Sequence, residues 1–199
     1  LDPILKQTVP PLEIIVVDDG STDETAAVIA SYGDAVKGIR IDRGKPAATR
    51  NAGAAAARGE WILFTDDDCR VPENWVEGMA AAAAHRRADA VCGGIEAFSL
   101  QTPAERYQHY RMKLIFGGRA KVVAACPLVN FLIRREVYEA AGGLDESLDF
   151  VLEDWEFGYR LRKLGHRIAY DPAVAVAHRY QQDWDAVVRR IEMTGAGGI

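Results

Sequence analysis

The chain has 199 residues, of which 49% are hydrophobic and 27% are charged, a balance typical of a folded globular domain. Its formal net charge of −5 argues against nucleic-acid binding, because nucleic-acid-binding proteins normally present a basic face. No apolar run reaches the ~18 residues that a membrane-spanning helix requires.

Short apolar runs alternate along the chain with segments whose apolar residues recur at helical spacing. Residues 13–17 (EIIVV) predict a buried strand, and Ser21 and Glu24 have the spacing of a capping box that begins a helix ending at Gly33. The other predicted strands lie at 35–41, 61–65, 90–98, 122–133 with a break near Cys126 and Pro127, 167–170 and 173–177. The other predicted helices lie at 46–58, 72–87, 104–115, 134–141, 153–164 and 183–193. This alternation predicts an α/β fold with a mostly parallel sheet and helices on both faces.

Three adjacent aspartates, Asp66, Asp67 and Asp68, follow the predicted strand at 61–65. Ligands of open α/β sheets bind outside the carboxyl ends of the strands. Three neighbouring carboxylates repel one another without a cation, and their hard oxygen atoms suit Mg²⁺ or Mn²⁺, which would bridge them to a diphosphate. The alternative is a solvated acidic loop that also caps the next helix, but the apolar strand before the aspartates favours a metal site.

A second acidic pair, Asp18 and Asp19, stands at the carboxyl end of the predicted strand at 13–17. A carboxylate here can accept hydrogen bonds from a base or a ribose, but acidic residues are also favoured at helix N-termini by the helix dipole. Arg50, on the predicted helix at 46–58, can contact a diphosphate or ribose or can belong to a solvated helix surface. Of these two roles, contact with a diphosphate or ribose is the favoured one for Arg50.

A third acidic group, Glu153 and Asp154, begins a predicted helix. A carboxylate in this place can act as general base on an acceptor hydroxyl, and crowding by Glu153 and Glu156 would raise the pKa of Asp154. The alternative is again stabilisation of the helix dipole. His178 gains a role only if the fold brings it close to Asp68, because a lone histidine is more often structural.

The three cysteines, Cys69, Cys92 and Cys126, are odd in number, and no two form a C-x-x-C pair. A zinc cage or a disulfide framework is therefore not expected. The cysteines favour a reducing compartment, so the expected location is the cytoplasm, and peripheral association with the inner face of a membrane is left open.

The motifs occur together and in a fixed order. They are EIIVVDDGSTDET, ATRNAGAAAARGEWILFTDDDC, LVNFLIRREVYEAAGGLDESL and EDWEFGYRLRKLGHRIAY. This series resembles the family-2 inverting glycosyltransferases, which have the Rossmann-like GT-A fold, and the resemblance covers residues 13–178. It implies transfer of a sugar from a nucleotide-diphosphate sugar, with UDP as the expected carrier, to an acceptor hydroxyl in one inverting displacement.

The resemblance implies roles for the residues that match its motifs. On the donor side, Asp18 and Asp19 would contact the nucleobase, and Asp66, with Asp67 beside it, would contact the ribose.

For the chemical step, Asp68 and His178 would hold Mn²⁺ or Mg²⁺. Asp154 would be the catalytic base, with Glu153 beside it.

One feature of the family is not found. Its members normally begin with an additional strand that ends in a Pro-Thr-Tyr-Asn-like turn, and nothing before residue 13 matches it. Residues 1–199 are therefore expected to form a single catalytic domain that is truncated at the N-terminus and whose first strand is missing. The acceptor can be a glycan, a lipid-linked glycan or a protein, no nucleic-acid partner is expected, and the oligomeric state is open.

Other enzyme classes explain fewer of the motifs. A dinucleotide-binding dehydrogenase would need G-x-G-x-x-G after an early strand, where this chain has DDGS. A sugar nucleotidyltransferase could use a similar sheet and metal, but it does not explain the acidic helix start at Glu153. A catalytically inactive glycosyltransferase-like binding domain has no physical need for the crowded aspartates. The last two classes remain the alternatives.

Overall fold

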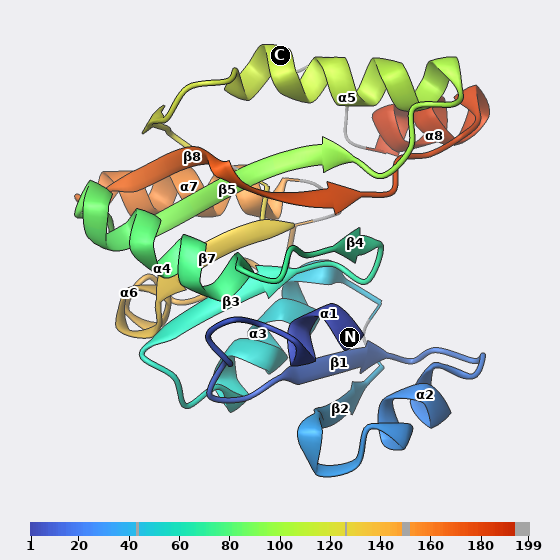
Figure 1. Cartoon of the computed structure of the whole chain (residues 1–199), viewed down its shortest axis with the longest axis vertical. Coiled ribbons are helices and arrows are strands. Elements are labelled where there is room, and N and C mark those ends of the chain that lie inside the picture. Colours follow the sequence, from blue (N-terminus) through green and yellow to red (C-terminus); the bar gives the residue numbers. More distant parts are fainter. Residues whose placement is uncertain (43, 126, 149–151, 194–199) are drawn as a thin grey trace.

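The computed structural model describes residues 1–42, 44–125, 127–148 and 152–193, and Figure 1 shows the strands layered between helices. In chain order the elements are α1 (Asp2–Leu5), β1 (Ile15–Asp19), α2 (Thr25–Ser31), the 3₁₀ turn η1 (Gly33–Ala35), β2 (Lys37–Ile41), α3 (Pro46–Ala56), β3 (Trp61–Thr65), β4 (Cys69–Arg70), α4 (Trp75–Arg86), β5 (Ala90–Ala97), α5 (Pro103–Phe116), β6 (Lys121–Val122), β7 (Asn130–Arg134), α6 (Arg135–Ala140), α7 (Glu153–Lys163), β8 (Ile168–His178) and α8 (Trp184–Met193). The α/β class predicted from the sequence is confirmed.

Within the described residues the strands form two sheets. β1 and β2 pair in parallel, and a larger sheet has the order β3-β7-β5-β8-β4, with β6 also pairing with β8. β7 runs antiparallel to both β3 and β5, and β5 runs parallel to β8, so β3, β5 and β8 share one direction, as expected for a mostly parallel sheet. β4, β6 and β7 run the other way. Alternation of strands and helices does not reveal this reversal, because β7 lies between two helices as a parallel strand would.

The helix α3 joins the two sheets. It packs on β1 and β2, while its Ala47 and Ala54 are buried in the same apolar cluster as Ile62 of β3. In the described part of the chain, no strand pairs with the edge of β1 away from β2 or with the edge of β3 away from β7.

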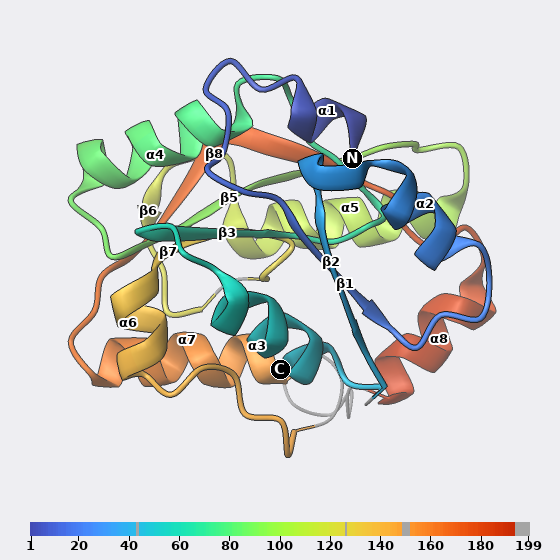
Figure 2. The same ribbon diagram turned by 90° about the horizontal axis from the view of Figure 1, so that it is seen from below.

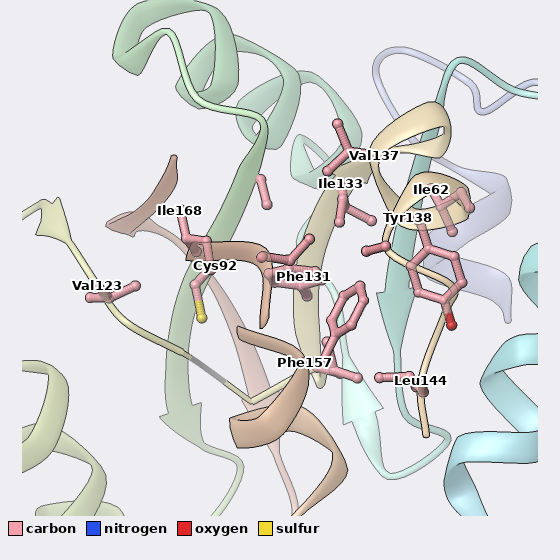
Figure 3. Packing of buried hydrophobic residues seen from close by; sticks show 14 of the residues in the cluster. Ile62, Cys92, Val123, Phe131, Ile133, Val137, Tyr138, Leu144, Phe157 and Ile168 are labelled. Atoms are coloured by element: carbon pink, nitrogen blue, oxygen red, sulfur yellow. The ribbon is translucent and has the colours of Figure 1, made fainter. Parts of the chain in front are cut away.

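Each face of the larger sheet has its own apolar core, because side chains alternate along a strand. Cys92 of β5 and Phe131 of β7 are buried on one face with Phe157 of α7 (Figure 3). Their neighbours Val91 and Leu132 are buried on the opposite face under α4. Figure 2 shows α4 on one side of the sheet and α3, α6 and α7 on the other, so helices cover both faces as predicted.

Two local predictions are wrong. Ser21 does not cap a helix, because α2 begins at Thr25 with Glu24 as its N-cap residue and no side-chain cap. The backbone N–H of Ser21 instead donates to the Asp18 carboxylate. The two late strands are one strand, β8, whose register with β5 shifts between Gly93 and Gly94, so that an irregularity takes the place of a break.

Cys92 is disulfide-bonded, whereas Cys69 is a free thiol. No disulfide framework was expected from the odd number of cysteines, but an odd number does not exclude a single bridge. With Cys92 in a disulfide, the cysteines no longer favour a reducing compartment. No helix in the described ranges is long and apolar enough to cross a membrane.

Candidate active site

The acidic pair at the end of β1 shapes the turn that follows the strand. Asp18 is buried, and its carboxylate accepts hydrogen bonds from the Ser21 N–H at 2.9 Å and from the Arg40 guanidinium at 2.5 Å. The hydrogen bonds from Ser21 and the charge of Arg40 hold the pKa of Asp18 below its usual range. Asp19 accepts hydrogen bonds from the Gly44 N–H at 3.0 Å and the Thr49 hydroxyl at 3.2 Å. Both carboxylates are thus fixed at the carboxyl edge of the strand.

Arg50 joins two acidic groups that are far apart in the sequence. Its guanidinium donates to the Asp66 carboxylate at 2.9 Å and to the Glu153 carboxylate at 3.1 Å. The side chain of Arg50 is only 18% exposed. Since the neighbouring residue on α3, Thr49, contacts Asp19, one turn of this helix connects the end of β1, the end of β3 and the start of α7. Three of the acidic motifs therefore meet at one edge, although each is remote from the others along the chain.

The acidic start of α7 has an unusual electrostatic environment. Glu153 is buried, one of its oxygens accepts from Arg50, and the other has no hydrogen-bond partner within the described residues. Burial and the neighbouring charge of Glu153 raise the pKa of Asp154 to about 7. Glu156, which was expected to contribute to this shift, instead forms an ion pair with Arg160. The shift itself matches the expectation for a general base near neutral pH.

Asp68 and His178 lie close together, as a shared cation site requires. The His178 Nε2 atom is 3.3 Å from the Asp68 carboxylate, because β4 pairs antiparallel with β8 and places Cys69 opposite His178. Burial opposes ionisation of Asp68, but the hydrogen bond and charge of His178 outweigh it and lower the pKa of Asp68. The buried Nδ1 atom of His178 has no hydrogen-bond partner in the part of the chain that is described.

The donor atoms at this point fit a divalent cation. A carboxylate oxygen of Asp68, the Sγ atom of Cys69 and a ring nitrogen of His178 all lie within 4.8 Å of one another. Oxygen and imidazole ligands suit Mn²⁺ and similar ions. Burial and the neighbouring charge of Asp68 raise the pKa of the Cys69 thiol to about 12.

A pocket opens beside these groups and contains residues that the sequence motifs did not single out. Its lining consists of Asp67, Asp68, Cys69, Arg70, Phe98 and Arg179. The Arg179 guanidinium lies over the Phe98 ring at 5.4 Å. Arg70 and Arg179 could have been predicted as site residues from the sequence, because Arg70 closely follows the three aspartates and Arg179 directly follows His178. No feature of the sequence indicated Phe98.

Asn51, the neighbour of Arg50 on α3, contacts a different part of the molecule. Its Oδ1 atom accepts hydrogen bonds from the Leu144 N–H at 2.9 Å and the Tyr138 hydroxyl at 2.6 Å. Its Nδ2 atom donates to the Leu144 carbonyl at 2.9 Å and to the Glu146 carboxylate at 3.0 Å. Asn51 therefore fixes the loop that follows Gly143 to the same helix that carries Arg50.

Comparison with known proteins identifies the family of the chain. Residues 1–142 match the family described as Glycosyl transferase family 2. The chain belongs to this family. The pre-mycofactocin glycosyltransferase of Mycobacterium tuberculosis is 29% identical over 195 residues, which is 88% of this chain but 40% of that protein. The chain thus spans less than half the length of this relative.

Solved structures share the fold at lower sequence identity. GalNAc-T7, crystallised with UDP, GalNAc and Mn²⁺, superposes with a TM-score of 0.70 at 21% identity, over 96% of this chain and 44% of that chain. S. aureus TarS 1-349 in complex with UDP-GlcNAc superposes with a TM-score of 0.68 at 20% identity, over 92% of this chain and 54% of that chain. The family-2 chain therefore has the GT-A fold expected from its motifs.

Proposed function

We propose that residues 1–199 form the catalytic domain of a metal-dependent inverting glycosyltransferase that moves a sugar from a UDP-sugar to an acceptor hydroxyl. The observation that carries this proposal is the bridge from Arg50 to Asp66 and Glu153, because it brings a donor-side carboxylate and the neighbour of the base to one edge of the sheet. The UDP, UDP-GlcNAc and Mn²⁺ in the structures of GalNAc-T7 and TarS support the choice of donor and cation.

Asp154 is the proposed base. Its raised pKa of about 7 makes the carboxylate more basic than usual, while much of it is still ionised at neutral pH. Asp154 accepts the proton of the acceptor hydroxyl, and the hydroxyl oxygen bonds to the anomeric carbon from the face opposite the nucleotide. The bond from that carbon to the diphosphate breaks, its electron pair leaves with UDP, and the anomeric configuration inverts.

The remaining residues hold the donor. Asp18, Asp19 and Asp67 are proposed to contact the nucleoside, and Asp66, oriented by Arg50, to accept hydrogen bonds from the ribose. Asp68 and His178 would hold a divalent cation, which when bound stabilises the negative charge of the departing diphosphate. Arg70 and Arg179 add positive charge to the pocket beside Asp68, where they can face phosphate oxygens.

The test is release of UDP from UDP-sugars with Mn²⁺, measured for the native chain and for Asp154→Asn. We expect Asp154→Asn to lower kcat by about 10²–10⁴-fold while the Kd for UDP stays unchanged, because the amide cannot accept the proton but the donor contacts remain. Glu156→Gln is the matched control: it lies on the same helical turn, pairs with Arg160, and should keep full activity.

Three results would contradict the proposal. Full turnover by Asp154→Asn would remove its base, and retention of the anomeric configuration in the product, read by NMR, would exclude a single displacement. Release of pyrophosphate in place of UDP would favour a sugar nucleotidyltransferase.

A further inference from the structure

Cys69 lies at the cation site but has no part in the proposed transfer. It follows Asp68 directly in the chain, and the pairing of β4 with β8 places it opposite His178. Residues directly opposite in an antiparallel pair project to the same face of the sheet. A backbone hydrogen bond also joins the two segments here, because the Arg179 N–H donates to the Asp68 carbonyl at 3.0 Å. The three side chains are therefore held together by strand pairing and not by a mobile loop alone.

The separations between the donor atoms suit coordination of one ion. The Cys69 Sγ atom is 3.6 Å from one oxygen of Asp68, and the His178 Nε2 atom is 3.3 Å from the other. In a tetrahedral zinc site, bond lengths of ~2.3 Å to sulfur and ~2.1 Å to oxygen or nitrogen give edges of ~3.6 Å between sulfur and oxygen and ~3.4 Å between nitrogen and oxygen. One ligand atom from each of the three residues lies within 4.8 Å of the other two, which is compatible with a single shared ion.

We propose that Cys69 is a third protein ligand of this cation site and gives it a preference for thiophilic divalent cations, such as Zn²⁺, Co²⁺ and Cd²⁺, over Mg²⁺. The inference rests on the proposed cation site at Asp68 and His178 and extends it. Cys69 is a free thiol, so it is available as a ligand. On binding, the thiol releases its proton to solvent and the thiolate sulfur donates to the cation.

The chemistry of the ligands sets the order of affinities. Mg²⁺ prefers oxygen ligands and dehydrates reluctantly, so a thiolate adds little to its binding. Soft thiolate ligands favour zinc-like ions, and imidazole suits them as well. The pocket lined by Asp67, Arg70 and Arg179 leaves the site open on one side, where water or a phosphate oxygen can complete the coordination.

The experiment is a titration of the native chain, Cys69→Ser and Cys69→Ala with Co²⁺, followed by absorption spectroscopy, and with Cd²⁺ and Mg²⁺, followed by calorimetry. The native chain should show a thiolate-to-cobalt charge-transfer band in the near-ultraviolet, which both variants lose. Loss of an outer-shell partner costs about 10–100-fold in metal affinity, so loss of a direct ligand should weaken Cd²⁺ binding by about 100-fold or more. Mg²⁺ affinity should stay the same in all three proteins.

The possible failures are distinguishable. If Co²⁺ binds to the native chain without the charge-transfer band and Cys69→Ser binds Cd²⁺ equally well, Cys69 is not a ligand, but the cation site at Asp68 and His178 stands. If no cation binds to the native chain, both the ligand role of Cys69 and the proposed cation site are refuted. Circular dichroism of Cys69→Ser shows whether the variant is folded, and Cys69→Ala provides a second, independent substitution.

Discussion

Replacement of Arg50 by methionine removes the guanidinium that holds Asp66 and Glu153 together while keeping an apolar side chain of similar length. The Glu153 carboxylate is buried and loses its one hydrogen-bond donor within the described residues, and a hydrogen bond to a charged group is worth about 1.5–3 kcal/mol. The Asp66 carboxylate is 35% exposed, so its half of the bridge is worth about 0.2–1 kcal/mol. The free energy of unfolding should therefore fall by about 2–4 kcal/mol.

Urea denaturation of four proteins tests this value: the native chain, Arg50→Met, Glu153→Gln and the double variant. If the bridge is the cause, Arg50→Met should cost clearly less in the Glu153→Gln background, because the buried charge is then absent. Arg58→Met is the matched control, since Arg58 pairs with Glu13 but is 73% exposed, and its loss should cost less than about 1 kcal/mol. Equal losses for Arg50→Met and Arg58→Met, or full additivity in the double variant, would refute the bridge as an organising contact.

Three further predictions follow from the same contacts. The pKa of Asp154 is raised from 3.8 to about 7, so between these pH values the folded state binds more protons than the unfolded state. The free energy of unfolding should therefore fall as the pH rises from about 4 to about 7. Urea denaturation at a series of pH values should show a weaker dependence of this free energy on pH for Asp154→Asn than for the native chain. Asn51→Ala leaves the Leu144 N–H without its acceptor and should speed hydrogen exchange in the loop after Gly143, with a stability loss of about 1–3 kcal/mol; unchanged exchange there would contradict the anchoring role. A Cβ atom at Gly93 would lie 2.1 Å from the Asn130 side-chain nitrogen, so Gly93→Ala should clearly lower the melting temperature. A melting temperature equal to that of the native chain would contradict the close packing at the irregularity between β5 and β8.

The fold was predictable from the sequence where local patterns decide the structure. β3 has the predicted bounds, because an apolar, β-branched and aromatic run predicts a strand when polar residues end it on both sides. The position of the acidic residues at the carboxyl ends of β1 and β3 could also be predicted, because it depends only on the direction in which each strand runs.

The contacts between motifs were not predictable, because they depend on how distant elements pack. Arg50 reaches Asp66 and Glu153 because α3 sits between the two sheets, which helical periodicity does not specify. Proximity of Cys69 to His178 follows from the register of β4 with β8, and a two-residue strand leaves no detectable pattern. The direction of β7 was likewise decided by tertiary pairing and not by its own residues.

Calorimetric titration of UDP, with and without Mn²⁺, tests the central claim most directly. The proteins are the native chain, Asp68→Asn and the control Asp34→Asn, whose exposed aspartate lies in η1, in the connection from α2 to β2. The account predicts Mn²⁺-dependent binding of UDP by the native chain and by Asp34→Asn, and loss of the Mn²⁺ dependence in Asp68→Asn. UDP binding that is the same with and without Mn²⁺, or that Asp68→Asn leaves unchanged, would contradict a metal-dependent donor site at the end of β3.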